Sequence, residues 1–80
     1  MVVVNFWAGL RSYTDGREKI NVEAKTVGEV LRGVSIAFPV LSDYLEDNVS
    51  VVVDGLFVAS LHEPVCKNSE VWLIKRVSGG

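Results

Sequence analysis

The sequence predicts an α+β fold in which one mixed sheet packs against a single helix. Runs of β-branched and aromatic residues near both ends of the chain favour strands. Between residues 26 and 38, apolar residues recur at helical spacing. An Asp-Gly pair at 54–55, flanked by apolar runs, is a strong hairpin signal. In chain order the elements read β-β-α-β-β-β over 80 residues without a linker, which predicts one layered domain.

The first two strands are expected at residues 2–8 and 17–23, joined by turn residues at 12–16. Asn5 interrupts the first apolar run and sets its alternation. With Asn5 outward, Val3 and Trp7 also point outward. The inward residues of the two strands are then Val2, Val4, Phe6, Ala8, Ile20 and Val22. Gly16 is available for a left-handed position in the turn.

The helix is expected to begin after Thr26, because Glu29 three residues later completes a capping-box pattern. One face of the helix carries Val27, Val30, Leu31, Val34 and Phe38. Pro39 ends it. Gly28 and Gly33 each weaken the helix by about 1 kcal/mol relative to Ala. We therefore expect them to let the helix lie close against the sheet.

The second half of the chain predicts three more strands. Residues 40–47 read as an irregular or short helical connection, and residues 49–60 as a hairpin around Asp54-Gly55. Residues 61–69 read as a loop, since Pro64 opposes a central strand. Residues 70–77 form the last strand, in which Val71 and Leu73 share one phase and Trp72 and Ile74 the other.

The composition excludes several function classes. The chain is 49% hydrophobic and 22% charged, as in a globular protein. A net charge of −2 does not suggest a nucleic-acid surface. The single cysteine, Cys66, allows no intrachain disulfide and fits a reducing compartment. Residues 1–11 do not have the basic start of a signal peptide, and no apolar run approaches the ~20 residues of a membrane span. A soluble cytoplasmic protein is expected.

No pattern in the sequence indicates an enzyme acting alone. His62 and Cys66 are too few to form a metal site, and no basic partner is placed beside the thiol. Asp43, Glu46 and Asp47 read as a solvated acidic connection rather than a catalytic pair. No Gly-rich phosphate loop follows a strand.

Two features call for a functional explanation, an apolar sheet face and a Gly-Gly end. The alternation places Trp7, Trp72 and Ile74 on the face that a single helix cannot cover, and Val52 and Phe57 are candidates for the same face. Exposed apolar patches of this kind mark interaction sites, and Trp is favoured at their centres. Alternatively, the connection 39–47 or a dimer covers these residues. The domain is expected over residues 1–76, followed by a flexible tail at 77–80.

The complete pattern resembles the ubiquitin-like β-grasp sulfur carriers. Within that group it is most similar to the small subunit of molybdopterin synthase, in the stretches MVVVNFWAGLR and SEVWLIKRVSGG. Carriers of the thiamine pathway come next, although they are usually shorter. The resemblance covers essentially the whole chain as a pattern, and the first strand and the last dozen residues in detail. It implies a ubiquitin-like β-grasp fold.

The resemblance also implies a chemistry for the tail. In these families a partner adenylyltransferase, similar to ubiquitin-activating enzymes, uses ATP and Mg²⁺ to adenylate the terminal carboxylate, and a persulfide donor then converts it to a thiocarboxylate. Gly80 is thus the expected reactive residue, with Gly79 beside it. A further expected partner is the large subunit of molybdopterin synthase or another sulfur-accepting enzyme, while the chain itself binds no cofactor. The expected partner-binding residues are Trp7, Val52, Phe57, Trp72, Ile74, Arg76 and Val77.

Other functions remain open at this point. The same adenylate could join Gly80 to lysines of other proteins, which would make the chain a ubiquitin-like modifier. The sulfur could instead go to thiamine or to tRNA thiolation. A plain interaction domain with an incidental Gly-Gly end is the remaining alternative.

Overall fold

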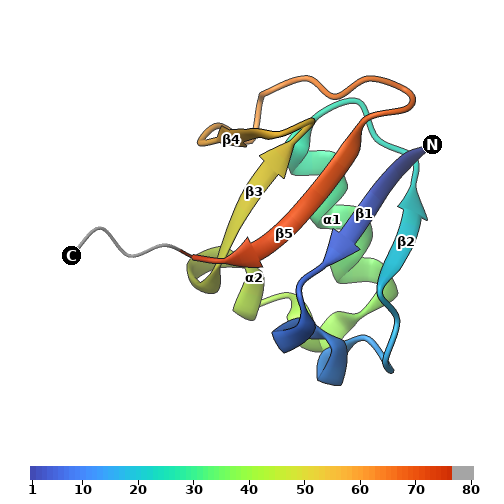
Figure 1. The fold of residues 1–80 in the computed structure, drawn as a ribbon, viewed down its shortest axis with the longest axis vertical. Helices are drawn as coiled ribbons and strands as arrows, with labels where there is room; N and C mark the ends of the chain where they lie inside the picture. The colour runs from blue at the N-terminus through green and yellow to red at the C-terminus, as the bar shows by residue number, and fades with distance from the viewer. Residues whose placement is uncertain (77–80) are drawn as a thin grey trace.

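The computed structural model describes residues 1–76, apart from the side chains of Glu46 and Asp47. Over these residues five strands form one mixed sheet in the order β2-β1-β5-β3-β4, in which only β1 and β5 run parallel (Figure 1). The strands are β1 Val2–Phe6, β2 Lys19–Val22, β3 Val49–Val53, β4 Leu56–Val58 and β5 Glu70–Lys75. The helical segments are α1 Val27–Ala37, α2 Tyr44–Asn48 and the 3₁₀ turns η1 Ala8–Tyr13 and η2 Pro39–Leu41. The predicted α+β fold and its element order are confirmed.

Helix α1 lies across one face of the sheet and begins where the capping pattern predicts (Figure 1). The Glu29 N–H donates to Thr26 Oγ1 at 3.2 Å. In return, Glu29 Oε1 accepts a bond from the Lys25 N–H at 3.1 Å, so the reciprocal bond goes to the residue before the cap. The Phe38 N–H donates to the Val34 carbonyl, and Pro39 then begins η2. No helix within residues 1–76 is long and apolar enough to cross a bilayer.

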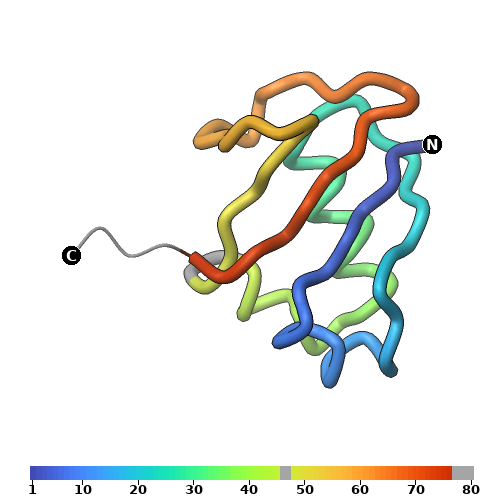
Figure 2. Tube along the Cα trace, in the orientation of Figure 1, coloured from blue at the N-terminus to red at the C-terminus, as the bar shows by residue number. Residues whose placement is uncertain are grey.

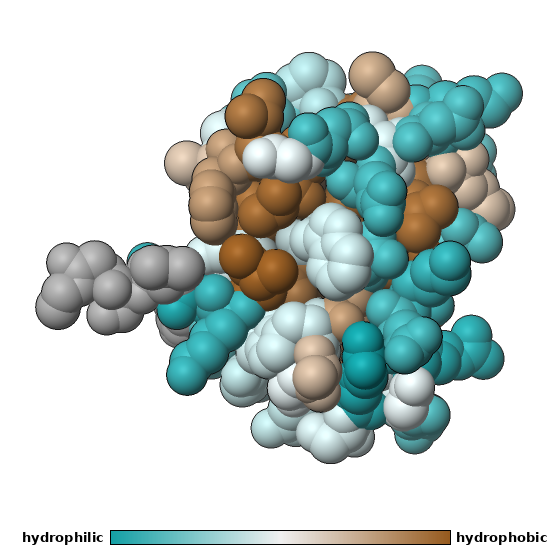
Figure 3. Space-filling view, viewed as in Figure 1, coloured by the Kyte–Doolittle hydropathy of each residue, from teal (hydrophilic) through white to brown (hydrophobic). Residues whose placement is uncertain are grey.

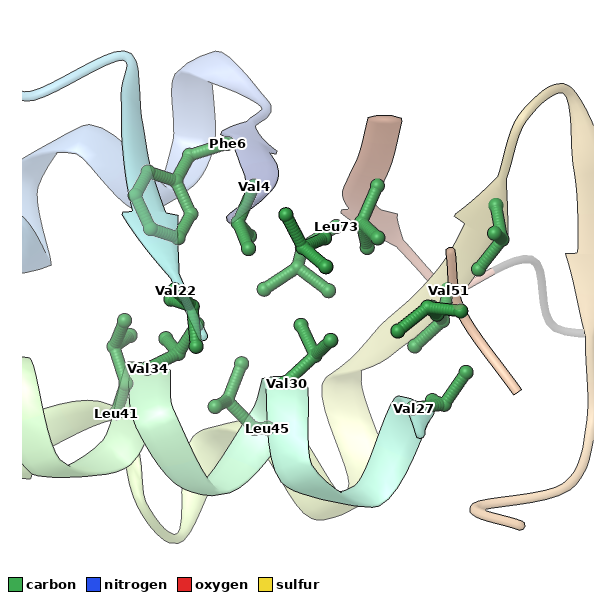
Figure 4. Close-up of a cluster of buried hydrophobic side chains, with 14 of the residues drawn as sticks. Val4, Phe6, Val22, Val27, Val30, Val34, Leu41, Leu45, Val51 and Leu73 are labelled. Atoms are coloured by element: carbon green, nitrogen blue, oxygen red, sulfur yellow. The ribbon is translucent and has the colours of Figure 1, made fainter. Parts of the chain in front are cut away.

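The core lies between α1 and the sheet (Figure 4). Val2, Val4 and Phe6 of β1 are fully buried and meet Val71 and Leu73 of the parallel strand β5. The other buried hydrophobic residues are Leu10, Val22, Val27, Val30, Val34, Leu41, Leu45, Val51, Val53 and Val65. The alternation predicted for β5 is therefore correct, with Val71 and Leu73 inward.

The first strand ends two residues earlier than predicted. The sequence analysis placed Ala8 inward on a strand over residues 2–8, and this is wrong, because β1 ends at Phe6 and Ala8 is an exposed residue of η1. The Trp7 N–H still donates to the Leu73 carbonyl at 3.1 Å, which continues the contact with β5 for one residue. Leu10 of η1 then fills the core in place of Ala8.

Both predicted turns form with the expected backbone. Asp15 and Gly16 have φ of 56° and 80°, and Asp54 and Gly55 have φ of 48° and 89°. Two successive positive values at Asp54-Gly55 are typical of the type I′ turn of a two-residue hairpin. Asp54 also ties this turn to the start of β5, since its N–H donates to the Glu70 carbonyl and its Oδ1 accepts from the Glu70 N–H, both at 2.9 Å.

The two helix glycines have different surroundings. A Cβ on Gly33 would overlap Cγ1 of Val22 in β2, so Gly33 allows the close approach to the sheet that the sequence predicts. Gly28 faces the loop 59–69 instead, and its N–H donates to the Leu61 carbonyl at 2.8 Å. Figure 2 shows this loop running along one end of the sheet, beside the start of α1. A bridge between Thr26 and Pro64 joins the two segments there.

Candidate functional site

The face of the sheet opposite α1 is turned toward the viewer in Figures 1 and 3. The register places four side chains of this face in one row across four strands. Asn5 of β1 pairs with Trp72 of β5, Trp72 pairs with Val52 of β3, and Val52 pairs with Phe57 of β4. Ile74 lies two residues beyond Trp72 on the same face of β5. The strands thus bring together four of the five apolar residues predicted there, and the fifth, Trp7, follows the end of β1.

We call Val52, Phe57, Trp72 and Ile74 the sheet-face patch. Trp72 is 41% exposed and Phe57 is 68% exposed, while Val52 and Ile74 are half-buried. Figure 3 shows hydrophobic atoms gathered over strands β3 and β5, bordered by hydrophilic ones. Large apolar side chains that share one exposed face and surround a Trp form the usual anatomy of a docking surface.

On β1 the row that contains Trp72 continues with a polar residue, Asn5. Asn5 is only 8% exposed although it points outward, since Lys19 and Trp72 flank it on the neighbouring strands. Its Nδ2 donates to the Val71 carbonyl at 3.2 Å and to Glu70 Oε1 at 3.3 Å. These bonds fix a polar side chain beside Trp72, whereas Val3, two residues earlier on the same face of β1, is apolar and half-buried.

Trp7, which the sequence analysis assigns to the same face, is not part of a strand and has a ring contact with Tyr44. It follows the end of β1, is half-buried and packs on the core. Its ring centroid is 6.4 Å from that of Tyr44, which in turn lies 5.3 Å from that of Tyr13. Tyr44 belongs to the connection 39–47, so the alternative that this connection covers the tryptophans applies to Trp7, whereas Trp72 stays exposed.

The strand that carries Trp72 and Ile74 is the last element before the tail in the sequence. Strand β5 ends at Lys75, one residue past Ile74, and the N–H of the exposed Arg76 donates to the Asn48 carbonyl at 3.1 Å. Val77, Gly79 and Gly80, which the sequence analysis assigns to partner binding and chemistry, lie outside the described residues. Two residues of the patch, Trp72 and Ile74, and the last described residue, Arg76, therefore lie on β5 and its extension.

The residues considered for chemistry elsewhere lie on the surface. His62 and Cys66 are exposed in the loop 59–69, where their N–H groups donate to Ser60 Oγ and Ser69 Oγ. Asp43 is exposed at the start of α2. Among residues 1–76, apart from the undescribed side chains, no group of three or more His, Cys, Asp and Glu could hold a metal ion. That these residues are not catalytic stays a prediction.

Sequence reasoning missed an open groove of about 890 Å³ between α1 and the β3–β4 hairpin. The residues that line the groove come from five separate segments of the chain, so no local sequence pattern predicts it. Among the lining residues to which the sequence analysis assigns no role are Arg32 and Leu61, and the local signal for the groove is a charged residue, Arg32, directly after the apolar helix residue Leu31. The groove is lined by Val27, Gly28, Leu31, Arg32, Ser35, Ser42, Leu45, Val49, Ser50, Val51, Phe57, Val58, Ala59, Ser60, Leu61 and Arg76.

The fold is shared with solved structures that cover nearly the whole chain. CysO of Mycobacterium tuberculosis superimposes with a TM-score of 0.86 at 20% identity, covering 96% of this chain and 100% of that one. SAMP1 of Haloferax volcanii gives a TM-score of 0.76 at 26% identity, covering 99% and 98%. A chain of the complex of subunits 1 and 2 of molybdopterin-converting factor from Helicobacter pylori gives 0.71 at 19% identity, covering 99% and 97%.

These similarities confirm the predicted ubiquitin-like β-grasp fold. A search among curated proteins finds no significant match to the sequence. The ThiS family model, in contrast, matches residues 4–80. This match includes the strands of the sheet-face patch and continues through both terminal glycines. The chain therefore belongs to the ThiS family, within the ubiquitin-like β-grasp sulfur carriers.

Proposed function

We propose that this protein carries sulfur as a thiocarboxylate on Gly80 and delivers it to molybdopterin synthesis. The observation that carries the proposal is the family match, which runs from β1 to residue 80. The structure supports it with an exposed Trp72 on the strand that leads into the tail. The proposal includes that Gly80 bears the terminal carboxylate.

The proposed reaction has three steps. The Gly80 carboxylate, which is ionised at neutral pH, attacks the α-phosphorus of ATP; a P–O bond forms and pyrophosphate leaves. The terminal sulfur of a protein persulfide then attacks the acyl carbon, a C–S bond forms and AMP leaves. A second thiol of the donor attacks the resulting acyl disulfide, which breaks the S–S bond, oxidises the donor to a disulfide and releases the thiocarboxylate. One oxygen has been replaced by one sulfur.

The carrier contributes a reactive end and a docking face to these steps. A narrow active site admits a segment with small cross-section and free dihedral angles, which Gly79 and Gly80 provide. The sheet-face patch would hold the domain on each partner in turn while the tail reaches the reaction centre. ATP, Mg²⁺ and the catalytic groups belong to the adenylyltransferase, and the sulfur acceptor would be the large subunit of molybdopterin synthase.

Intact mass spectrometry of the protein purified from its native cells tests the carrier chemistry. We expect a species in which one sulfur replaces one oxygen, and fragmentation should place that sulfur on Gly80. A strain without the gene should lose molybdoenzyme activity and regain it with the intact gene. Normal molybdoenzyme activity combined with a new requirement for thiamine, or with loss of tRNA thiolation, would assign the sulfur to another pathway.

A second candidate function is conjugation to other proteins. The similarity to SAMP1, a small archaeal modifier protein, at 26% identity favours it. The same Gly80 adenylate would then be attacked by a lysine amine, and AMP would leave as an isopeptide bond forms. Covalent adducts of higher mass, linked through Gly80 and resistant to thiols, would support this function in place of sulfur delivery.

A further inference from the structure

The groove between α1 and the β3–β4 hairpin has an apolar floor and an exposed rim. Leu31 of α1, Leu45 of α2 and Val58 of β4 line its inner part and are buried or half-buried. At the rim Phe57 and Leu61 are 68% and 58% exposed. Apolar side chains exposed beside an open cavity can bury considerable area against a ligand, so the groove is suited to an occupant with an apolar side chain.

The described lining of the groove is basic. It contains Arg32 and Arg76, and no Asp or Glu among the residues whose side chains the structure describes, whereas the whole chain has a net charge of −2. Arg32 is exposed on α1 and forms no ion pair with any other described residue. A guanidinium in this position can bind a carboxylate through two parallel hydrogen bonds. The groove therefore selects an acidic occupant.

The groove also borders a free sheet edge. Strand β4 is the last strand of the sheet and pairs only with β3 among the described residues. In a two-residue hairpin the residues flanking the turn, Val53 and Leu56, form the inner pair, so the N–H and C=O of Phe57 face away from β3. An extended segment can pair with these groups and direct alternate side chains into the groove.

We propose that this groove is a second docking site, which binds an extended acidic segment of a partner protein. The segment pairs with β4 at Phe57, places an apolar side chain on Leu31 and directs a carboxylate to Arg32. A second copy of the chain fits poorly, because a two-fold contact through β4 would bring the Arg32 side chains of both copies to one interface. The site goes beyond the proposed function, since it shares only Phe57 with the sheet-face patch, and its other lining residues are different.

The probe is a short labelled peptide with isoleucine and valine at its centre and glutamates on both sides. We expect it to bind the full chain, as measured by fluorescence anisotropy, and to shift the NMR signals of the Leu31, Arg32 and Phe57 amides. Arg32→Glu should weaken binding roughly tenfold or more, because an attractive charge pair becomes a repulsive one. Added salt should weaken binding to the parent chain.

The matched control is Arg17→Glu, the same charge change at an exposed residue near the opposite edge of the sheet. Its binding should stay within about twofold of the parent chain, because its charge lies far from the groove. The NMR spectrum of each variant reports whether it is folded. The proposal is overturned if the lysine version of the peptide binds equally well, or if the shifts are confined to Trp72 and Ile74. It is also overturned if sedimentation shows a dimer that Arg32→Glu dissociates.

Discussion

Gly33 is the residue that sets how closely α1 approaches the sheet. A Cβ at this position would overlap Val22 Cγ1, and Val22 is a buried residue of β2. In Gly33→Ala, helix propensity gains about 1 kcal/mol, but overpacking typically costs about 1–3 kcal/mol. We expect a net loss of stability of about 1 kcal/mol in urea denaturation.

Ile36→Ala on the same helix is the control for this prediction. Ile36 is 72% exposed, so its truncation should change the free energy of unfolding by less than about 0.5 kcal/mol. A Gly33→Ala protein more stable than the parent would mean that Val22 moves aside without cost and that the helix is not held at its closest approach.

Residues in and around η1 have positions that the local sequence pattern does not predict. The run VVVNFWA continues the alternation of a strand to residue 8, yet the chain leaves the sheet after Phe6 because Leu10, not Ala8, fills the core there. Thr14 is fully buried, with its Oγ1 donating to the Arg17 carbonyl at 2.9 Å, although its sequence context reads only as a turn. Tyr44 reaches Trp7 from a distant connection. These positions depend on tertiary packing.

At the scale of elements, strand β5 has neighbouring residues with different expected roles, one in stability and one in docking. Leu73 is fully buried, whereas its neighbour Trp72 is 41% exposed. Leu73→Ala should cost about 2–5 kcal/mol, because it removes buried apolar atoms and leaves a cavity. Since small domains have only about 5 kcal/mol or somewhat more in total, this variant is expected to be largely unfolded in urea melts.

Trp72→Ala is the companion prediction on the same strand. It should lower the free energy of unfolding much less than Leu73→Ala does, because part of the ring is already in water. It should weaken binding to the adenylyltransferase or the sulfur acceptor by about 2 kcal/mol or more in titrations, as central aromatic residues of interfaces do. Unchanged affinity for both partners would remove the sheet-face patch from the docking model.

The elements themselves were predictable because their signals are short-range. The alternation of Val71, Trp72, Leu73 and Ile74 assigns faces correctly, and Thr26 with Glu29 marks the true start of α1. Asp54-Gly55 forms the hairpin that this pair favours. The sheet-face patch follows from these elements. The groove does not, since α1, α2 and β4 meet there only after folding.

For the molecule as a whole, we expect the stability of the domain not to depend on its C-terminal residue. Removing Gly80, or extending the chain beyond it with a tag, should leave the unfolding transition of the domain unchanged, because every buried hydrophobic residue described lies at or before residue 73. ATP–pyrophosphate exchange with the cognate adenylyltransferase should be abolished, since the reacting carboxylate is lost or displaced. Persistent exchange without Gly80 would contradict the proposed chemistry.

Gly79→Val tests the shape of the tail in the same assay. A β-branched side chain adds bulk and restricts the backbone, so entry into a narrow active site should be hindered. We expect a folded protein that docks normally but is adenylated more slowly in single-turnover experiments. Equal rates for the variant and the parent chain would show that the site does not require a slender segment.

The parallel pairing of β1 with β5 has a consequence for biosynthesis. Val4 pairs with Val71, so the two central strands come from opposite ends of the chain. A polypeptide emerging from the ribosome keeps β1 and β3 without their common neighbour until β5 has been made, and such long-range pairing is completed late. A prematurely terminated chain without β5 has two unpaired strand edges and is open to proteases. In the proposed chemistry, an activating enzyme would therefore meet the Gly-Gly end only on molecules whose sheet can close.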